Sequence, residues 1–272
     1  MRLHDYLLRI GHSGALDTSF ETLRRLHVAH RETFLFENLS IQAGGGVSVT
    51  LGDIERKFID QGRGGYCFEH NTLFAAALRE CGFETTTLLG RVRRGPPATW
   101  ARTHMVLRVV APENRSATAS AERAWLADVG FGAISLIEPI PFVDGSTSRQ
   151  RGLMYTLRRE QHLWVLAMTD ATGVQDLYEF SDEPQTEGDV EVANHYTSTH
   201  PGSIFRKSLT IQAVRGNDRT ILRSTVVTKY VNGVLEESPI ERADLRRHAQ
   251  EIFGVELPHD PLVFDSYAGQ SW

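Results

Sequence analysis

The stretch Arg63–Asn71 reads Arg-Gly-Gly-Tyr-Cys-Phe-Glu-His-Asn and constrains the local fold more than any other part of the chain. Apolar residues recur behind it at helical spacing until Gly82, which predicts a helix that begins at Cys67. Gly64 and Gly65 allow a close backbone approach that a side chain would block. At a helix start, unpaired N–H groups and the helix dipole favour an anion, which predicts a lowered pKa for the thiol. Because the thiolate is the nucleophilic form, Cys67 is a candidate catalytic residue.

The composition excludes several classes of protein. A net charge of −5 gives no reason to expect a nucleic-acid partner. The two cysteines cannot build a disulfide framework. No apolar run approaches the ~20 residues of a membrane span, so we expect no membrane partner. Asp5 interrupts what would be the apolar core of a signal peptide, so we expect a cytoplasmic protein with reduced thiols. Nothing in the sequence indicates an oligomeric state.

The chain divides into three parts by its periodicity. Residues 1–83 are mostly helical and carry Cys67, residues 84–183 are rich in strands, and residues 184–272 are mixed. No helical pattern alternates with the central strands, which predicts an antiparallel sheet or small barrel rather than βαβ units. The expected strands lie at 84–92, 102–110, 124–130, 153–160, 162–169, 174–180, 205–213 and 220–237, the last with a hairpin signal at Asn232-Gly233. The other expected helices lie at 5–10, from a capping box at Thr18–Glu21, around 54–59, at 187–199 and at 243–253.

A base for the thiol follows from the arithmetic of one hairpin. His104 lies at the start of one expected strand and Asp128 at the end of the next. A register that pairs Val110 with Glu122 also places His104 opposite Asp128, with both side chains on one face. A carboxylate in that place accepts a hydrogen bond from the imidazole and fixes its tautomer. A nucleophilic cysteine needs such a base and such an orienting group.

Several motifs in order along the chain are similar to those of the arylamine N-acetyltransferases. The resemblance spans the whole chain and rests on the Cys67 motif with Tyr6–Gly11, Phe36–Leu39, Thr103–Leu107, Asp128–Gly132, Asn194–Ser198 and Pro201–Phe205. It implies an α+β fold in which an N-terminal helical bundle, a central antiparallel β-barrel and a C-terminal α/β lid surround a cysteine-protease-like core. It also implies that Cys67, His104 and Asp128 form a catalytic triad.

The resemblance further implies a ping-pong reaction through an acetyl-cysteine. Acetyl-CoA would be the co-substrate, and an arylamine, arylhydroxylamine or hydrazine nitrogen would receive the acetyl group. The resemblance places Phe36, Phe68 and Phe131 in the substrate pocket. It places Thr103, Gly130 and Gly132 beside the CoA arm. The sequence leaves the acyl donor open between acetyl-, propionyl- and malonyl-CoA.

Other interpretations of the same residues stay open. Transglutaminases and papain-like peptidases also place Cys before His before Asp or Asn, so thiol acyl transfer from glutamine or peptide hydrolysis is the alternative function. A non-catalytic binding module is a further alternative. Cys67 and His70 lack a second pair of ligands, so we expect no metal. Glu37 and Arg63 form an expected ion pair before the cysteine. The cluster Arg91, Arg93 and Arg94 is interpreted as a solvated strand end rather than a CoA phosphate site.

Overall fold

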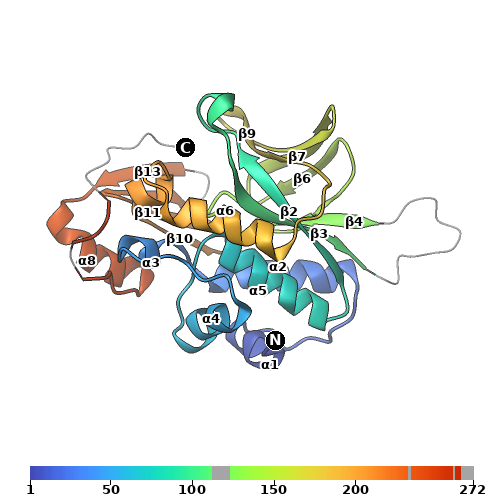
Figure 1. Ribbon diagram of the computed structural model, residues 1–272, viewed down its shortest axis with the longest axis horizontal. Coiled ribbons are helices and arrows are strands. Elements are labelled where there is room, and N and C mark those ends of the chain that lie inside the picture. The colour runs from blue at the N-terminus through green and yellow to red at the C-terminus, as the bar shows by residue number, and fades with distance from the viewer. Residues whose placement is uncertain (112–122, 232–233, 260, 265–272) are drawn as a thin grey trace, which may run out of the picture.

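The computed structural model describes residues 1–111, 123–231, 234–259 and 261–264. Figure 1 shows N-terminal helices below a curled antiparallel sheet and a second sheet at the left, where α8 also lies. Helix α6 (Glu187–Thr199) runs across the middle of the molecule. The arrangement is the α+β fold expected from the sequence.

The first part is built from short helices around the long buried helix α5. The helices are α1 (Leu3–Arg9), α2 (Phe20–Thr33), α3 (Leu39–Gln42), α4 (Leu51–Glu55) with a π-helical turn at Arg56–Asp60, and α5 (Cys67–Glu80). Ser19 caps α2, because its hydroxyl accepts the N–H of Thr22 at 3.2 Å. The cap therefore lies one residue after the predicted Thr18. Helix α5 begins at Cys67, as predicted, although it follows Tyr66 and has no Ser or Thr cap.

The second part is an eight-stranded antiparallel sheet with the order β5-β4-β3-β2-β9-β8-β7-β6. Its strands are β2 (Glu84–Val92), β3 (Arg102–Val110), β4 (Ala124–Ala127), β5 (Ile140–Pro141), β6 (Ser146–Gln150), β7 (Leu153–Glu160), β8 (Leu163–Asp170) and β9 (Gly173–Phe180). The edge strands β5 and β6 contact each other, so the sheet curls toward a barrel. The prediction missed both, because β5 has two residues and β6 is polar.

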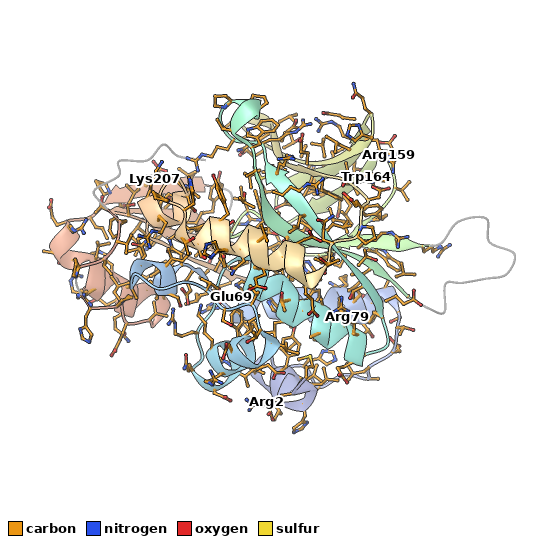
Figure 2. All side chains as sticks on the ribbon, viewed as in Figure 1. Arg2, Glu69, Arg79, Arg159, Trp164 and Lys207 are labelled. Carbon is orange, nitrogen blue, oxygen red and sulfur yellow. The ribbon has the colours of Figure 1, made fainter. Side chains whose placement is uncertain are left out.

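Side chains alternate across this sheet as the pleat requires. On β7, Leu153, Tyr155 and Leu157 are buried and the residues between them are partly exposed. Farther along the same face of β7, the Arg159 guanidinium lies 4.5 Å from the ring centre of the buried Trp164, its partner across β7 and β8 (Figure 2). One face of β7 thus fills the barrel, and the arginine at its end covers the edge of the core through its contact with the indole.

The hairpin register predicted for β3 and β4 is wrong by two residues. Val110 pairs with Ala124, and Leu107 pairs with Ala127. Glu122, the predicted partner of Val110, lies outside the described residues. Because a shift of two residues keeps every side chain on its face, His104 and Asp128 still meet, now as diagonal neighbours just beyond the paired residues. The contact was thus predicted correctly from an incorrect register.

The third part contains four strands of the second sheet and three helical segments. Its elements are α6, α7 (Ile204–Lys207), β10 (Thr210–Arg215), β11 (Asp218–Arg223), β12 (Val226–Val231), β13 (Val234–Pro239) and a helical segment at Arg242–Phe253 that contains α8 (Leu245–His248). The strand predicted at 205–213 is wrong in its first half, which is helical. Val231 pairs with Val234, and Asn232-Gly233 lies outside the described residues.

The second sheet joins the third part to the first. Its order is β1-β10-β11-β12-β13, and β1 (Phe36–Glu37) lies directly against β10 through the pair Phe36 and Gln212. Phe36 also forms a bridge with Gly65, next to the cysteine. The backbone before Cys67 is therefore held between parts that are distant in the chain. The boundaries at residues 83 and 183 stay a prediction.

Close backbone packing explains the glycine pair before the cysteine. Gly65 N–H donates to Leu35 O at 3.2 Å, and Glu37 N–H donates to Gly65 O at 2.7 Å. A Cβ atom on Gly64 would lie 1.7 Å from Leu35 O. Arg63 and Glu37 form the predicted ion pair at 2.7 Å, which holds the same two backbone segments together. Only glycine fits at position 64, as the sequence indicated.

Gly64→Ala is expected to lower the free energy of unfolding by about 3 kcal/mol, since the added methyl must push apart two hydrogen-bonded segments. Urea denaturation followed by circular dichroism measures this loss. Gly52→Ala is the control, because a Cβ there meets no atom within 4 Å and the residue lies in α4. Equal stability of the two variants would contradict the packing argument.

Three buried histidines in the helical part are kept neutral by burial, and their hydrogen bonds fix the tautomers. His70 Nε2 lies 3.0 Å from Leu35 O, and because a carbonyl only accepts, His70 Nδ1 accepts from His30 Nε2 at 2.9 Å. His30 Nδ1 then accepts from the Tyr6 hydroxyl at 2.9 Å. His27 likewise donates to a carbonyl through Nδ1 and accepts the Asp128 N–H through Nε2. Burial lowers the pKa of His27 and of His70 to about 3, and the pKa of His30 also falls well below its ordinary value.

Stability is therefore expected to fall as pH drops below about 6.5. In this range the unfolded chain takes up protons that the folded chain cannot accept, at about 1.4 kcal/mol per pH unit and per histidine. Burial raises the pKa of Glu69 to about 6, so this one group acts in the opposite direction below that pH. Urea denaturation at pH 7.5, 6.5, 5.5 and 4.5 measures the net loss. His162→Gln, at an exposed position, should leave the slope unchanged, whereas a flat profile in the wild type would contradict the assignment.

Candidate active site

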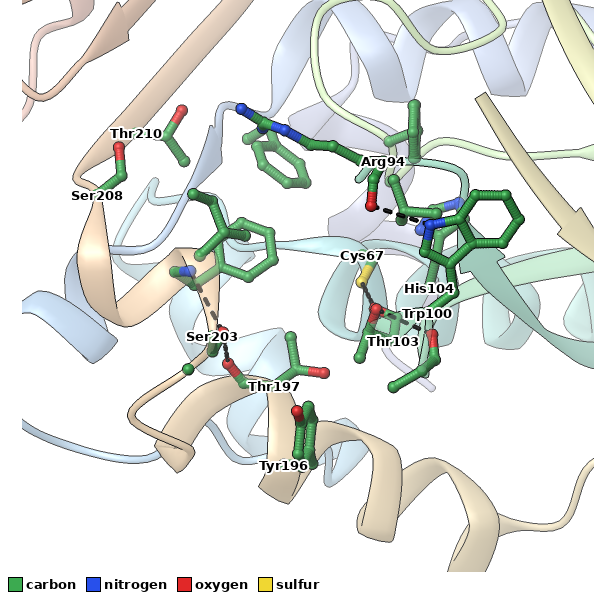
Figure 3. Close-up of a pocket in the computed structure, with 18 of the residues that line it drawn as sticks. Cys67, Arg94, Trp100, Thr103, His104, Tyr196, Thr197, Ser203, Ser208 and Thr210 are labelled. Atoms are coloured by element: carbon green, nitrogen blue, oxygen red, sulfur yellow. Dashed lines mark hydrogen bonds between the residues drawn. The ribbon is translucent and has the colours of Figure 1, made fainter. Parts of the chain in front are cut away.

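Cys67 is the first residue of α5 and lines a pocket of about 280 Å³. Its side chain is almost covered, with 3% of the residue exposed. The thiol lies 3.6 Å from Thr103 O at the start of β3, as Figure 3 shows. Gly130 packs on the other side, where a Cβ atom would lie 2.7 Å from Cys67 Cα. The sulfur is thus enclosed between the helix start, β3 and the turn after β4.

The lowered pKa predicted for Cys67 is wrong for this environment. Burial raises the pKa of the thiol well above its ordinary value, and the carboxylates of Asp128 and Glu69 act in the same direction. Hydrogen bonds from the backbone of Met105 and Phe68 act the other way but do not compensate. The helix start does favour the thiolate, as expected, but burial outweighs it. A separate base must therefore take the proton when the sulfur reacts.

His104 and Asp128 form a close buried pair. His104 Nε2 lies 2.8 Å from Asp128 Oδ2, and the two side chains are 3% and 0% exposed. Asp128 Oδ1 accepts the N–H of Gly130 at 2.9 Å. Burial alone would raise the pKa of Asp128, but His104, Gly130 and Asn71 lower it to about 2. Asp128 is therefore ionised, and it fixes the proton of His104 on Nε2.

Asn71 connects the cysteine helix to both strands of the pair. Its Nδ2 donates to Met105 O at 2.7 Å and to Asp128 Oδ1 at 3.2 Å. Its Oδ1 accepts the N–H of Val129 at 3.2 Å. Sequence reasoning quoted Asn71 in the motif but assigned it no role. Its position four residues after Cys67, on the same face of the helix, was the available signal.

Aromatic rings cover the imidazole of His104. The ring centres of Phe131 and Tyr178 lie 4.8 Å and 4.7 Å from that of His104. Both rings are nearly buried, and they also contact each other at 5.0 Å. They limit the orientations of the imidazole and keep water from the pair.

The structure brings most of the predicted site residues to the pocket, but not all. Five of them line it together with Cys67, namely Phe36, Thr103, His104, Gly130 and Phe131. Phe68 does not line it, because its ring is fully buried and packs edge-on against Tyr66. Gly132 does not line it either: it has φ +81° and faces the Gln212 side chain.

The pocket lining also contains residues to which the sequence analysis assigned no role. Trp100 lies on the loop between β2 and β3, and its indole N–H reaches Arg94 O and Gly95 O at 3.0 Å. Tyr196 and Thr197 come from α6, and Phe205 comes from α7. Figure 3 shows Trp100 and Tyr196 at the pocket. No pattern indicated Trp100, because an aromatic residue in a loop also fits an ordinary surface, whereas Tyr196, Thr197 and Phe205 lie in two of the motifs that carry the family resemblance.

In the part of the chain that the structure describes, no group of three or more His, Cys, Asp or Glu side chains could hold a metal ion. None of the helices within the described ranges is long and apolar enough to cross a membrane.

The chain is similar in sequence and in fold to known enzymes. The profile of a family described as N-acetyltransferase matches residues 19–262. An arylamine N-acetyltransferase of Mycolicibacterium smegmatis is 36% identical over 247 residues, 89% of this chain and 87% of that protein. One of Escherichia coli K12 is 34% identical over 257 residues, 93% of this chain and 88% of that protein. The solved structure of Mycobacterium marinum arylamine N-acetyltransferase in complex with CoA has a TM-score of 0.85 and 32% identity, and the match covers 93% of this chain and 92% of that one.

Proposed function

The chain belongs to the arylamine N-acetyltransferase family of acyltransferases, and from that premise we propose that it moves an acetyl group from acetyl-CoA to an arylamine or hydrazine nitrogen through an acetyl-cysteine on Cys67. The observation that carries this proposal is the enclosure of Cys67 and His104 in one pocket, with His104 oriented by Asp128 at 2.8 Å.

In the first half-reaction the Cys67 sulfur attacks the thioester carbonyl. His104 takes the thiol proton through Nδ1, because its Nε2 is already committed to Asp128. The tetrahedral intermediate breaks the bond to the CoA sulfur, and His104 returns the proton to it as CoA leaves. Backbone N–H groups beside the sulfur, including that of Phe68, are the candidate donors to the oxyanion.

In the second half-reaction the amine nitrogen attacks the acetyl carbonyl of Cys67. The carbon–sulfur bond breaks, the amine loses a proton to His104, His104 returns that proton to the Cys67 sulfur, and the amide leaves. The rings of Phe36 and Phe131 line the pocket and are suited to stack on an aromatic acceptor, at about 0.5–1.5 kcal/mol per ring pair. Phe68 supports the pocket from the buried core and does not touch the acceptor.

The CoA arm has room to approach beside Thr103 and Gly130. Thr103 offers its backbone next to the thiol, and Gly130 has no side chain to block the sulfur. Gly132 serves the turn rather than the ligand: its carbonyl accepts from the buried Arg31 at 2.6 Å. This role replaces the CoA contact expected from the sequence.

An intact-protein mass spectrum tests the proposal. The protein is incubated separately with acetyl-, propionyl- and malonyl-CoA, and a single added acyl group on the peptide that contains Cys67 is expected with the true donor. Addition of an aniline should remove that group as the amide. A stable thiol with every donor, together with cleavage of a peptide substrate, would favour the peptidase alternative instead.

A further inference from the structure

Two arginines lie on one wall of the pocket. Arg94, which follows β2, and Arg223, the last residue of β11, both line the cavity that contains Cys67. Thr210 pairs directly with Arg223 across β10 and β11, so the two side chains lie on the same face of the sheet. Figure 3 shows the Arg94 side chain extending on the side of the pocket where Thr210 and Ser208 lie. Two guanidinium groups and two hydroxyls thus share this wall.

The charges of this wall act on each other. Burial lowers the pKa of Arg223 to about 10, and the positive charge of Arg94 acts in the same direction. Glu237 of β13 acts the other way, and more weakly than Arg94. With a pKa of about 10, Arg223 is still charged at neutral pH. Arg223 therefore keeps its positive charge in a partly desolvated place, where an anion is bound more strongly than in water.

Arg94 differs in its position from Arg91 and Arg93. Arg91 donates to Trp100 O at 2.6 Å. Arg93 is held by three carboxylates, those of Glu160, Asp176 and Glu179. Neither lines the pocket, whereas Arg94 does. The basic cluster therefore does not act as one solvated strand end: two of its members brace the loop and the third reaches the cavity.

We propose that Arg94 and Arg223 bind an anionic group of a substrate and make the enzyme selective for substrates that carry one. The group is a carboxylate on the ring of the acceptor or a phosphate of the acyl donor, since a guanidinium recognises both. The expected effect on acetyl transfer rests on the proposed function, whereas the binding of the anion does not.

Ping-pong kinetics separates the two sources, because kcat/KM for each substrate reports only its own half-reaction. For Arg223→Gln and for Arg94→Gln, kcat/KM is measured with two pairs of substrates. The acceptor pair is 4-aminobenzoate and its neutral ethyl ester. The donor pair is acetyl-CoA and S-acetyl-N-acetylcysteamine, which has no phosphate. A loss of about 10- to 100-fold is expected for the anionic member of one pair, with little change for its neutral partner. Arg223→Lys should recover part of the loss. Arg102→Gln is the control, because Arg102 is exposed and outside the pocket lining.

A binding measurement keeps this test independent of acetyl transfer. Sodium benzoate and inorganic pyrophosphate serve as probes that slow the alkylation of Cys67 by iodoacetamide. Protection in the wild type and its loss in Arg223→Gln would support the anion site even if no acyl donor reacts. Equal losses for charged and neutral substrates, or no protection by either probe, would overturn the inference.

Discussion

Replacing Cys67 with serine is expected to lower the rate of acetyl transfer by about 10³-fold or more, because a hydroxyl is a far weaker nucleophile and leaving group than a thiol. The structural change is small, since the residue is buried and the two side chains have the same shape. The loss should therefore fall on kcat, with little change in the melting temperature. Stopped assays of thiol release from acetyl-CoA, with and without an aniline, measure it.

Cys81→Ser is the matched control for this variant. Cys81 ends the same helix and is partly exposed, yet it lies outside the pocket. It should keep full activity. Iodoacetamide should label Cys67 in the wild type with a rate that depends on His104, since burial alone holds the thiol protonated. Near wild-type transfer by Cys67→Ser would remove the acetyl-cysteine from the mechanism.

Much of the fold was predictable because the relevant information is local. The predicted strands at 84–92, 102–110 and 153–160 have the bounds seen in the structure. Each of these segments shows either alternating apolar residues or a continuous apolar run, which are the patterns of a buried strand. Helix 187–199 was also predicted with its observed bounds. The two-residue strands, Phe36–Glu37 and Ile140–Pro141, were not predictable, because they are too short to show a pattern and only their pairing with β10 and β4 defines them.

The site was predictable in its chemistry and less so in its environment. His104 and Asp128 meet because strand pairing needs only the correct face, and an error of two residues preserves the face. The pKa of Cys67 depends instead on how completely Thr103 and Gly130 cover the sulfur, which no local pattern encodes. The same holds for Arg223, which is placed in the pocket by a strand more than 150 residues after Cys67.

Asp128→Asn is expected to lower kcat/KM for acetyl-CoA by about 10³- to 10⁴-fold while leaving the fold intact. The reason lies in the other partners of the carboxylate. Oδ1 accepts from Gly130 N–H and from Asn71 Nδ2, so the oxygen of an asparagine amide is required on that side. Its NH₂ group must then face His104, whose Nε2 can only accept from it. The imidazole proton moves to Nδ1, the atom that has to take the proton from Cys67.

Two measurements separate this tautomer effect from simple loss of stability. Circular dichroism and a melting curve should show a folded protein, and alkylation of Cys67 should slow in parallel with acetyl transfer, since both need His104 as an acceptor. Asp144→Asn is the control, because that carboxylate lies in an exposed turn and accepts only from Arg159 N–H among the hydrogen bonds of the described residues. If Asp128→Asn kept more than a tenth of the activity, the orientation of His104 would not depend on this carboxylate. The imidazole would then be held by Phe131 and Tyr178 alone, whose rings restrict its plane but do not select the nitrogen that carries the proton.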